Sequence, residues 1–304
     1  MTRNEILNNL KGVICPIATP FDRRGNVDEG HFRENLSRLA GIGLGGILVS
    51  GSTGEAPYLT ESERLRLVEL AREVIRPPEL LMVGTGLEST RATLNLSQEV
   101  VERGADVILV VTPNYFKPMM NTAALVEHYR TIGAGVKRPV MIYAIPQFTG
   151  LDVDTATIVK LSRLPNIVGL KESSGRLDYA RTVLRGAGRK FLVTVGSANI
   201  FEDALAAGAV GAVLGMANFD PTLCVGLYQA FINRQAQQAR DLQRRLAILA
   251  QKITIPFGVP GVKVAMDVCG YHGGDPRPPL LPVGPKGKKQ IAAALREAHA
   301  GLAA

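Results

Sequence analysis

Lys171 is the residue of this chain best placed for nucleophilic chemistry, because it directly follows the apolar run Ile167–Leu170. If that run forms a buried strand, the lysine ends in a site that holds little water. Desolvation disfavours the ammonium form, lowers the pKa and supplies the neutral amine that attacks a carbonyl carbon. The alternative interpretation is a lysine that reaches solvent or pairs with Glu172.

Two other segments carry groups that would complement an amine. The segment Gly51–Glu55 follows another apolar run, and its glycines allow successive backbone amides to converge on a carboxylate or phosphate. Tyr143 ends the run Val140–Tyr143, where a phenol can transfer protons. Taken singly, the first segment is also compatible with an ordinary turn, and Tyr143 with a core tyrosine.

These segments belong to a pattern that repeats along the chain, in which a short apolar run, a turn and an amphipathic stretch follow one another. The runs are Val13–Thr19, Ile47–Ser50, Leu81–Thr85, Val107–Val111, Val140–Ala144, Ile167–Lys171, Leu192–Gly196 and Ala212–Leu214. Continuous apolar runs are typical of parallel strands buried on both faces, with helices as crossovers. This number of repeats favours a closed (β/α)8 barrel over an open doubly wound sheet. The glycines of Gly41–Gly46 precede a strand, so no dinucleotide-binding fingerprint supports the open sheet.

The strand pattern stops after Phe219, and helical periodicity continues to the end of the chain. We therefore predict a barrel over residues 1–220 and a helical region over residues 221–304 that packs on it. The expected helices are Thr222–Ile232, Gln235–Lys252, Val262–Cys269 and about Lys288 to His299, with breaks at Pro256 and Pro260. Barrel enzymes work at the carboxyl ends of their strands, so Lys171, Tyr143 and Gly51–Glu55 should face one mouth.

Composition excludes several other classes of protein. Among 304 residues, 46% are hydrophobic and 20% charged, which is incompatible with a disordered chain. The polar start and the absence of a long apolar run predict no membrane span and a cytoplasmic location. The net charge of +8 is spread along the chain without a nucleic-acid-binding module, so we expect small anionic substrates and no nucleic acid.

Metal and hydrolase chemistry are not expected. His31, His128, His272 and His299 stand apart in the sequence without partners at metal-ligand spacing, and the three cysteines are equally scattered. We therefore predict isolated histidines and no metal site. Ser52 lacks the Gly-x-Ser-x-Gly elbow of serine hydrolases.

The motifs resemble those of the dihydrodipicolinate synthase/N-acetylneuraminate lyase family over almost the whole chain. The resemblance is carried by Gly51–Glu55, Val111–Tyr115, Tyr143–Pro146 and Val168–Lys171, and by the spacing between these motifs. It implies a class I aldolase on a (β/α)8 barrel with a helical C-terminal extension.

The resemblance also implies roles for individual residues. Lys171 would form a Schiff base with the keto carbon of pyruvate, with no separate cofactor, and Ser52 and Thr53 would bind the pyruvate carboxylate. Tyr143 would act as general acid and base, with Thr53 and Tyr115 as relay partners. The protonated imine is an electron sink, which lets the adjacent carbon exchange a proton or a carbon–carbon bond.

Further implications concern the pocket wall and the assembly. Gly196 and Val213 match positions that line the pyruvate pocket. Tyr115 would reach in from a neighbouring subunit, which requires a homo-oligomer, and the family is typically a tetramer built as a dimer of dimers.

Departures from the family pattern bear on the second substrate. Gln147-Phe148 stands where dihydrodipicolinate synthases carry an arginine that clamps the aldehyde's carboxylate. Gly196–Asn199 lacks the acidic pair of sialate lyases. The segments that instead resemble 4-hydroxy-2-oxoglutarate aldolase are Glu88–Thr93, Thr149–Asp152, Gly196–Ala198 and Phe257–Gly261.

The expected reaction is thus cleavage of 4-hydroxy-2-oxoglutarate to pyruvate and glyoxylate, with Ser173 as a candidate contact for the distal carboxylate. Ser173 is equally compatible with a loop-capping role. The main alternative is condensation of pyruvate with aspartate semialdehyde by a dihydrodipicolinate synthase. A sugar-acid aldolase or dehydratase and a non-catalytic binding protein are further alternatives.

Overall fold

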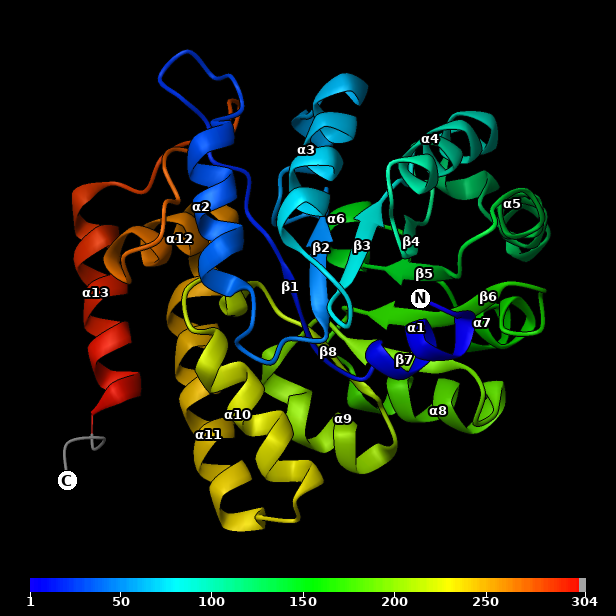
Figure 1. Cartoon of the computed structure of the whole chain (residues 1–304). Helices are drawn as coiled ribbons and strands as arrows, with labels where there is room; N and C mark the ends of the chain where they lie inside the picture. Colours follow the sequence, from blue (N-terminus) through cyan, green and yellow to red (C-terminus); the bar gives the residue numbers. More distant parts are fainter. Residues whose placement is uncertain (301–304) are drawn as a thin grey trace.

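The computed structural model describes residues 1–300, and its centre is a closed barrel of eight parallel strands in sequential order (Figure 1). The strands are β1 (Gly12–Pro16), β2 (Gly46–Val49), β3 (Leu80–Gly84), β4 (Val107–Val111), β5 (Val140–Ala144), β6 (Ile167–Glu172), β7 (Leu192–Val195) and β8 (Gly211–Val213). Each strand corresponds to one of the predicted apolar runs, and β1 pairs with β8 to close the sheet. The (β/α)8 prediction is confirmed.

Helices follow the strands and surround the barrel (Figure 1). They are α2 (Glu29–Leu39), α3 (Glu61–Val74), α4 (Thr90–Glu102), α5 (Thr122–Gly135), α6 (Pro146–Thr149), α7 (Thr155–Leu161), α8 (Leu177–Ala187) and α9 (Phe201–Ala207). The start of α3 is a capping box in which Thr60 and Glu63 satisfy each other's backbone amides. Gly208 ends α9 in the left-handed conformation that a residue without Cβ adopts at little cost.

The barrel interior is filled by side chains and is closed at its amino end. Ile14, Leu48 and Met141 lie in this inner cluster. The helix α1 (Arg3–Asn9) contributes Ile6 to this cluster, and Leu10, the residue directly after α1, also belongs to it. Because α1 precedes β1, these side chains cover the end of the barrel where the strands begin. Ligands therefore have access at the opposite end, where the strands stop.

Four further helices pack together on one side of the barrel (Figure 1). They are α10 (Pro221–Ile232), α11 (Ala236–Leu249), α12 (Ile255–Val268) and α13 (Pro285–His299). Buried side chains such as Leu223 and Ile253 join the same apolar core as the outer face of the barrel. The predicted domain boundary at residue 220 falls between β8 and α10. Because the two regions share one apolar core, this boundary stays a prediction.

The predicted breaks in the C-terminal region differ in detail from the structure. A π-helical segment, Ala250–Thr254, leads into α12, and Pro256 occupies the first turn of α12 without interrupting it. The kink falls at Gly258, whose φ of 55° and ψ of −141° are open to glycine. Pro260 lies two residues further on, where its missing amide fits the interruption. Among the helices of residues 1–300, none is both long and apolar enough to cross a membrane.

Candidate active site

Lys171 lies in β6 with only 4% of its surface exposed. In the sheet it is the register partner of Tyr143 on β5 and of Thr194 on β7. Its Nζ lies 3.9 Å from the centre of the Tyr143 ring. Burial lowers the pKa of Lys171 from 10.5 to about 7. A substantial fraction of the amine is therefore neutral near pH 7, as the sequence predicts for a nucleophile.

Tyr143 connects the amine to the loop after β2. Its hydroxyl lies 3.2 Å from Ser52 Oγ. Burial raises the pKa of Tyr143 to about 12, although contact with Ser52 opposes the rise. Ser173 lies close enough to favour the phenolate too, but no hydrogen bond of standard geometry joins its buried hydroxyl to Tyr143. The phenol is thus protonated in the unliganded site and is able to donate.

The loop Gly51–Glu55, predicted to bind an anion, forms a tight turn after β2. Ser50 and Glu55 flank it with φ values of 54° and 58°. The amide of Glu55 donates to the Ser52 carbonyl at 3.1 Å. Within residues 1–300 the amides of Ser52 and Thr53 have no hydrogen-bond acceptor. Two adjacent free amides at a barrel mouth are suited to a carboxylate.

Thr53 lies within this loop, and among residues 1–300 no hydrogen bond joins it to the Tyr143 phenol. The described hydrogen bond of Tyr143 goes to Ser52 rather than to Thr53. Thr53 Oγ1 instead lies at van der Waals distance from the position that a Cβ on Gly215 would occupy, just after β8. The relay role of Thr53 stays a prediction.

Gly196 lies just after β7 and Val213 lies on β8, and their role in lining the pyruvate pocket stays a prediction. Val213 belongs to β8 and is 2% exposed. Gly196 follows β7, and its amide donates to the Glu172 carbonyl at 2.6 Å. A Cβ added at Gly196 would lie 1.9 Å from Ser173 Oγ. The missing side chain at Gly196 is therefore what leaves room for Ser173.

A cavity of about 880 Å³ opens beside Ser52 and Tyr143, and within residues 1–300 its lining does not include Lys171, Thr53, Ser173, Gly196 or Val213. Ser52 and Tyr143 belong to its lining, together with Glu88, Asn114 and Gln147. Its apolar residues include five from α6, from α12 and from the segment before α13: Phe148, Phe257, Val259, Leu280 and Leu281. The helical C-terminal region thus forms part of the wall.

Three charged side chains near the mouth, those of Arg64, Glu55 and Lys263, make contacts that the sequence analysis does not predict. Arg64 lines the cavity from α3, and its guanidinium donates to the Ala56 carbonyl at 2.5 Å. Glu55 pairs with Lys263 of α12 at 2.6 Å, and both side chains are fully buried. Lys263 also donates to the Asp275 carbonyl at 2.9 Å. Glu55 and Lys263 are far apart in the sequence, so no local spacing indicates that they pair.

Tyr115 is not part of the cavity of its own chain. Its side chain is 76% exposed and meets the Phe116 ring edge-on, with 5.0 Å between the ring centres. Its amide donates to Glu88 Oε2 at 2.8 Å, which fixes the backbone. A single chain therefore does not bring Tyr115 to Tyr143, and its role from a neighbouring subunit stays a prediction.

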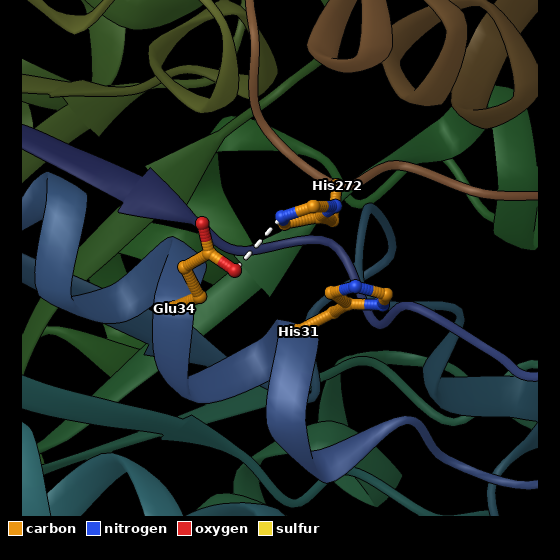
Figure 2. Close-up of side chains that lie close together, drawn as sticks. All are labelled: His31, Glu34 and His272. Carbon is orange, nitrogen blue, oxygen red and sulfur yellow. Dashed lines mark hydrogen bonds and ion pairs between the residues drawn. The ribbon is translucent and has the colours of Figure 1, made fainter.

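The expectation of four isolated histidines is wrong for one pair. The rings of His31 and His272 stack with 3.8 Å between their centres. Helix α2 and the segment after α12 meet there, so the fold joins residues that are far apart in the sequence (Figure 2).

Comparison with known proteins gives the same assignment across the chain. The model of the Dihydrodipicolinate synthetase family matches residues 9–298. A 4-hydroxy-tetrahydrodipicolinate synthase of Methanococcoides burtonii is 31% identical over 94% of this chain and 98% of its own. A probable mitochondrial 4-hydroxy-2-oxoglutarate aldolase of Emericella nidulans is 33% identical over 94% and 93% of the two chains.

Solved structures agree with this match. The dihydrodipicolinate synthase of Aquifex aeolicus superposes with a TM-score of 0.87 at 30% identity, covering 95% of this chain and 98% of that chain. A prophage protein of Escherichia coli K12, solved with pyruvate, gives a TM-score of 0.89 at 28% identity over 95% and 98%. By sequence and by fold, this chain belongs to the dihydrodipicolinate synthetase family.

Proposed function

We propose that this protein cleaves 4-hydroxy-2-oxoglutarate to pyruvate and glyoxylate through a Schiff base on Lys171. As a member of its family the chain is an enzyme of the aldolase and lyase class. The observation that carries the proposed chemistry is the buried amine of Lys171, whose pKa is lowered to about 7, directly against Tyr143. That amine is the nucleophile a class I aldolase needs.

The proposed reaction begins when the Lys171 amine attacks the keto carbon, and loss of water leaves a protonated imine. The free amides of Ser52 and Thr53 hold the adjacent carboxylate. Tyr143 donates its proton to the hydroxyl that leaves as water, and the imine cation beside its ring stabilises the resulting phenolate, because an opposite charge lowers the pKa of the phenol. Tyr143 then accepts the proton of the C4 hydroxyl.

Bond cleavage completes the cycle with Tyr143 as the proton carrier. The C3–C4 bond breaks, its electron pair moves into the imine to form an enamine, and glyoxylate leaves. Tyr143 returns the proton to C3, and water hydrolyses the imine to release pyruvate and free Lys171. No redox partner or additional cofactor enters this balance.

The choice of 4-hydroxy-2-oxoglutarate depends on the segment after β5. Gln147 there donates to the Ser173 carbonyl at 2.7 Å, and the neighbouring Phe148 is 66% exposed. Neither offers the bidentate cation that clamps a second carboxylate in dihydrodipicolinate synthases. Within residues 1–300 the buried hydroxyl of Ser173 has no hydrogen-bond partner, which supports a contact with the distal carboxylate.

Synthesis of 4-hydroxy-tetrahydrodipicolinate is the second candidate, because several similar relatives carry that name. The two reactions are separated by comparing kcat/KM for cleavage of 4-hydroxy-2-oxoglutarate with kcat/KM for condensation of pyruvate and aspartate semialdehyde. We expect cleavage to exceed condensation by at least about 100-fold, which corresponds to roughly 3 kcal/mol of transition-state discrimination. Faster condensation would establish the second candidate.

We further propose that the enzyme acts in the cytoplasm as a homotetramer. Support for an assembly comes from large apolar side chains exposed near β4, namely Tyr115, Phe116 and Met119, at 76%, 68% and 63%. Such patches are typical of protein–protein contacts.

A further inference from the structure

A cluster of three potential metal ligands lies where α2 meets the segment after α12 (Figure 2). His31 and Glu34 extend from α2, three residues apart and therefore on the same face of the helix. His272 comes from the chain that follows α12, and its Nε2 lies 2.9 Å from Glu34 Oε2. One ligand atom from each of the three residues lies within 4.8 Å of the others.

We propose that His31, Glu34 and His272 form a surface site for Zn²⁺, with water completing a tetrahedral shell. Two imidazoles and a carboxylate are a common ligand set for zinc, with metal–ligand distances of about 2.0–2.2 Å. The ion would join α2 to the segment after α12 and so attach the C-terminal region to the barrel more firmly. The residues lie outside the lining of the cavity above Tyr143.

The backbone of the third ligand is already fixed against α2. Asn35, fully buried on that helix, donates to the His272 carbonyl at 2.8 Å and accepts from the His272 amide at 2.9 Å. The position of His272 relative to His31 and Glu34 is thus set by two hydrogen bonds. Preorganised ligands reduce the entropic cost of binding an ion.

Neighbouring carboxylates orient the ligands as in known zinc sites. Asp28 Oδ2 lies 2.8 Å from His31 Nδ1. This contact leaves Nε2 of His31 available and matches the carboxylate–histidine–zinc arrangement. Glu34 uses its other oxygen, Oε1, to bind Arg38 at 2.7 Å, so that Oε2 stays directed at His272.

Binding requires a small movement of exposed side chains. The ligand atoms of a tetrahedral zinc site are about 3.3 Å apart, and His272 and Glu34 are 2.9 Å apart without an ion. The rings of His31 and His272 are stacked with planes 21° apart, so one ring must turn to direct its lone pair at the shared ion. Half of the His31 side chain is exposed, which leaves room for that rotation.

Isothermal titration of metal-free, tag-free protein with ZnCl2 tests the proposal at pH 7.5. We expect one ion per chain, a micromolar Kd, and a Kd at least about 30-fold weaker in His31→Gln and in His272→Gln, as loss of one of three ligands implies. His299→Gln is the matched control, because His299 also pairs with a carboxylate, Asp220, at 2.9 Å. Its affinity should equal that of the unmodified chain.

A second readout does not depend on heats of binding. Zinc at about 100 times Kd should raise Tm by about 5 °C in the unmodified chain and in His299→Gln, and EDTA should reverse the rise. Neither His31→Gln nor His272→Gln should respond, and the Tm of each without zinc reports that it is folded. Absence of binding at 100 µM zinc, or binding that both variants retain, would overturn the proposal.

Discussion

At the scale of single residues, the proposed function depends on one amine, that of Lys171, whose pKa is lowered by burial. A lysine that directly ends an apolar run predicts a buried amine, and the structure confirms it for Lys171, which is 4% exposed. The sequence also placed Tyr143 and Ser52 on strand ends. It did not indicate that these two hydroxyls lie 3.2 Å apart, because that pairing depends on the curvature of a loop.

The lowered pKa predicts the pH dependence of Schiff-base formation. The rate constant for imine formation with pyruvate should rise with pH through about 7 and level off above pH 8, because only the neutral amine attacks. Stopped-flow measurement under single-turnover conditions gives this profile. A midpoint near 10 would mean that Lys171 is not desolvated in solution.

Burial of Lys171 also has a cost for stability. In the folded chain its pKa falls from 10.5 to about 7, so between these pH values the unfolded chain binds a proton that the native chain lacks. Stability of the unmodified protein should therefore rise with pH across that window. Below pH 7, the free energy of unfolding of Lys171→Met, measured in urea, should exceed that of the unmodified protein by about 2–5 kcal/mol. Lys160→Met, at an exposed position, should have nearly the free energy of unfolding of the unmodified protein. Equal stability of both variants would contradict the account.

At the scale of elements, strands and crossover helices were predictable because each depends on a local pattern of apolar residues. The backbone conformations of the turns were less predictable from the sequence. Ser50 and Glu55 adopt positive φ values without being glycine, and nothing in their residue types indicates it. The requirement for glycine at position 196 arises from Ser173, which lies on the loop after a different strand.

Gly196→Ala tests how tightly the ends of β6 and β7 fit. Its new Cβ would lie 1.9 Å from Ser173 Oγ, so we expect a loss of at least about 2 kcal/mol in unfolding free energy and a higher KM for 4-hydroxy-2-oxoglutarate. Removing the obstacle in Gly196→Ala/Ser173→Gly should restore most of the stability. Gly284→Ala, where nothing lies within 4 Å, is the control. If Gly196→Ala were as stable as Gly284→Ala, the loops after β6 and β7 would be able to rearrange at little energetic cost, which contradicts the tight fit.

At the scale of the whole molecule, the C-terminal helices pack on one side of the barrel and contact the loop after β2 at its carboxyl end. Their existence was predictable from periodicity, but their attachment was not, since Glu55 and Lys263 meet only in the folded chain. This pair connects the loop Gly51–Glu55 to α12. The Arg277 amide adds a bond of 2.8 Å to Glu55 Oε2.

Lys263→Met should destabilise the protein by about 3–5 kcal/mol, because it leaves the Glu55 carboxylate buried without its partner. The double variant Glu55→Gln/Lys263→Met should recover part of that loss, since it leaves no unpaired charge. Urea unfolding of the single and double variants provides the measurement. Strictly additive losses would mean that the two groups do not interact.

Subunit mixing tests whether Tyr115 acts from a neighbouring chain. Tyr115→Phe and Lys171→Met should each be nearly inactive. In mixed dimers one site has an intact lysine from one chain and an intact tyrosine from the other, so random exchange should restore about a quarter of wild-type activity. No recovery in mixtures shown by native mass spectrometry to contain mixed oligomers would place the function of Tyr115 within its own chain, or nowhere.

The central claim is that Lys171 carries the substrate as an imine, and borohydride trapping tests it most directly. Protein incubated with pyruvate and reduced should gain the mass of one reduced pyruvate adduct per chain, and peptide mass spectrometry should locate it on Lys171. Lys171→Met should gain none under the same conditions, and Lys160→Met should be labelled like the unmodified protein. An unlabelled protein, or a specific adduct on another lysine, would contradict the account.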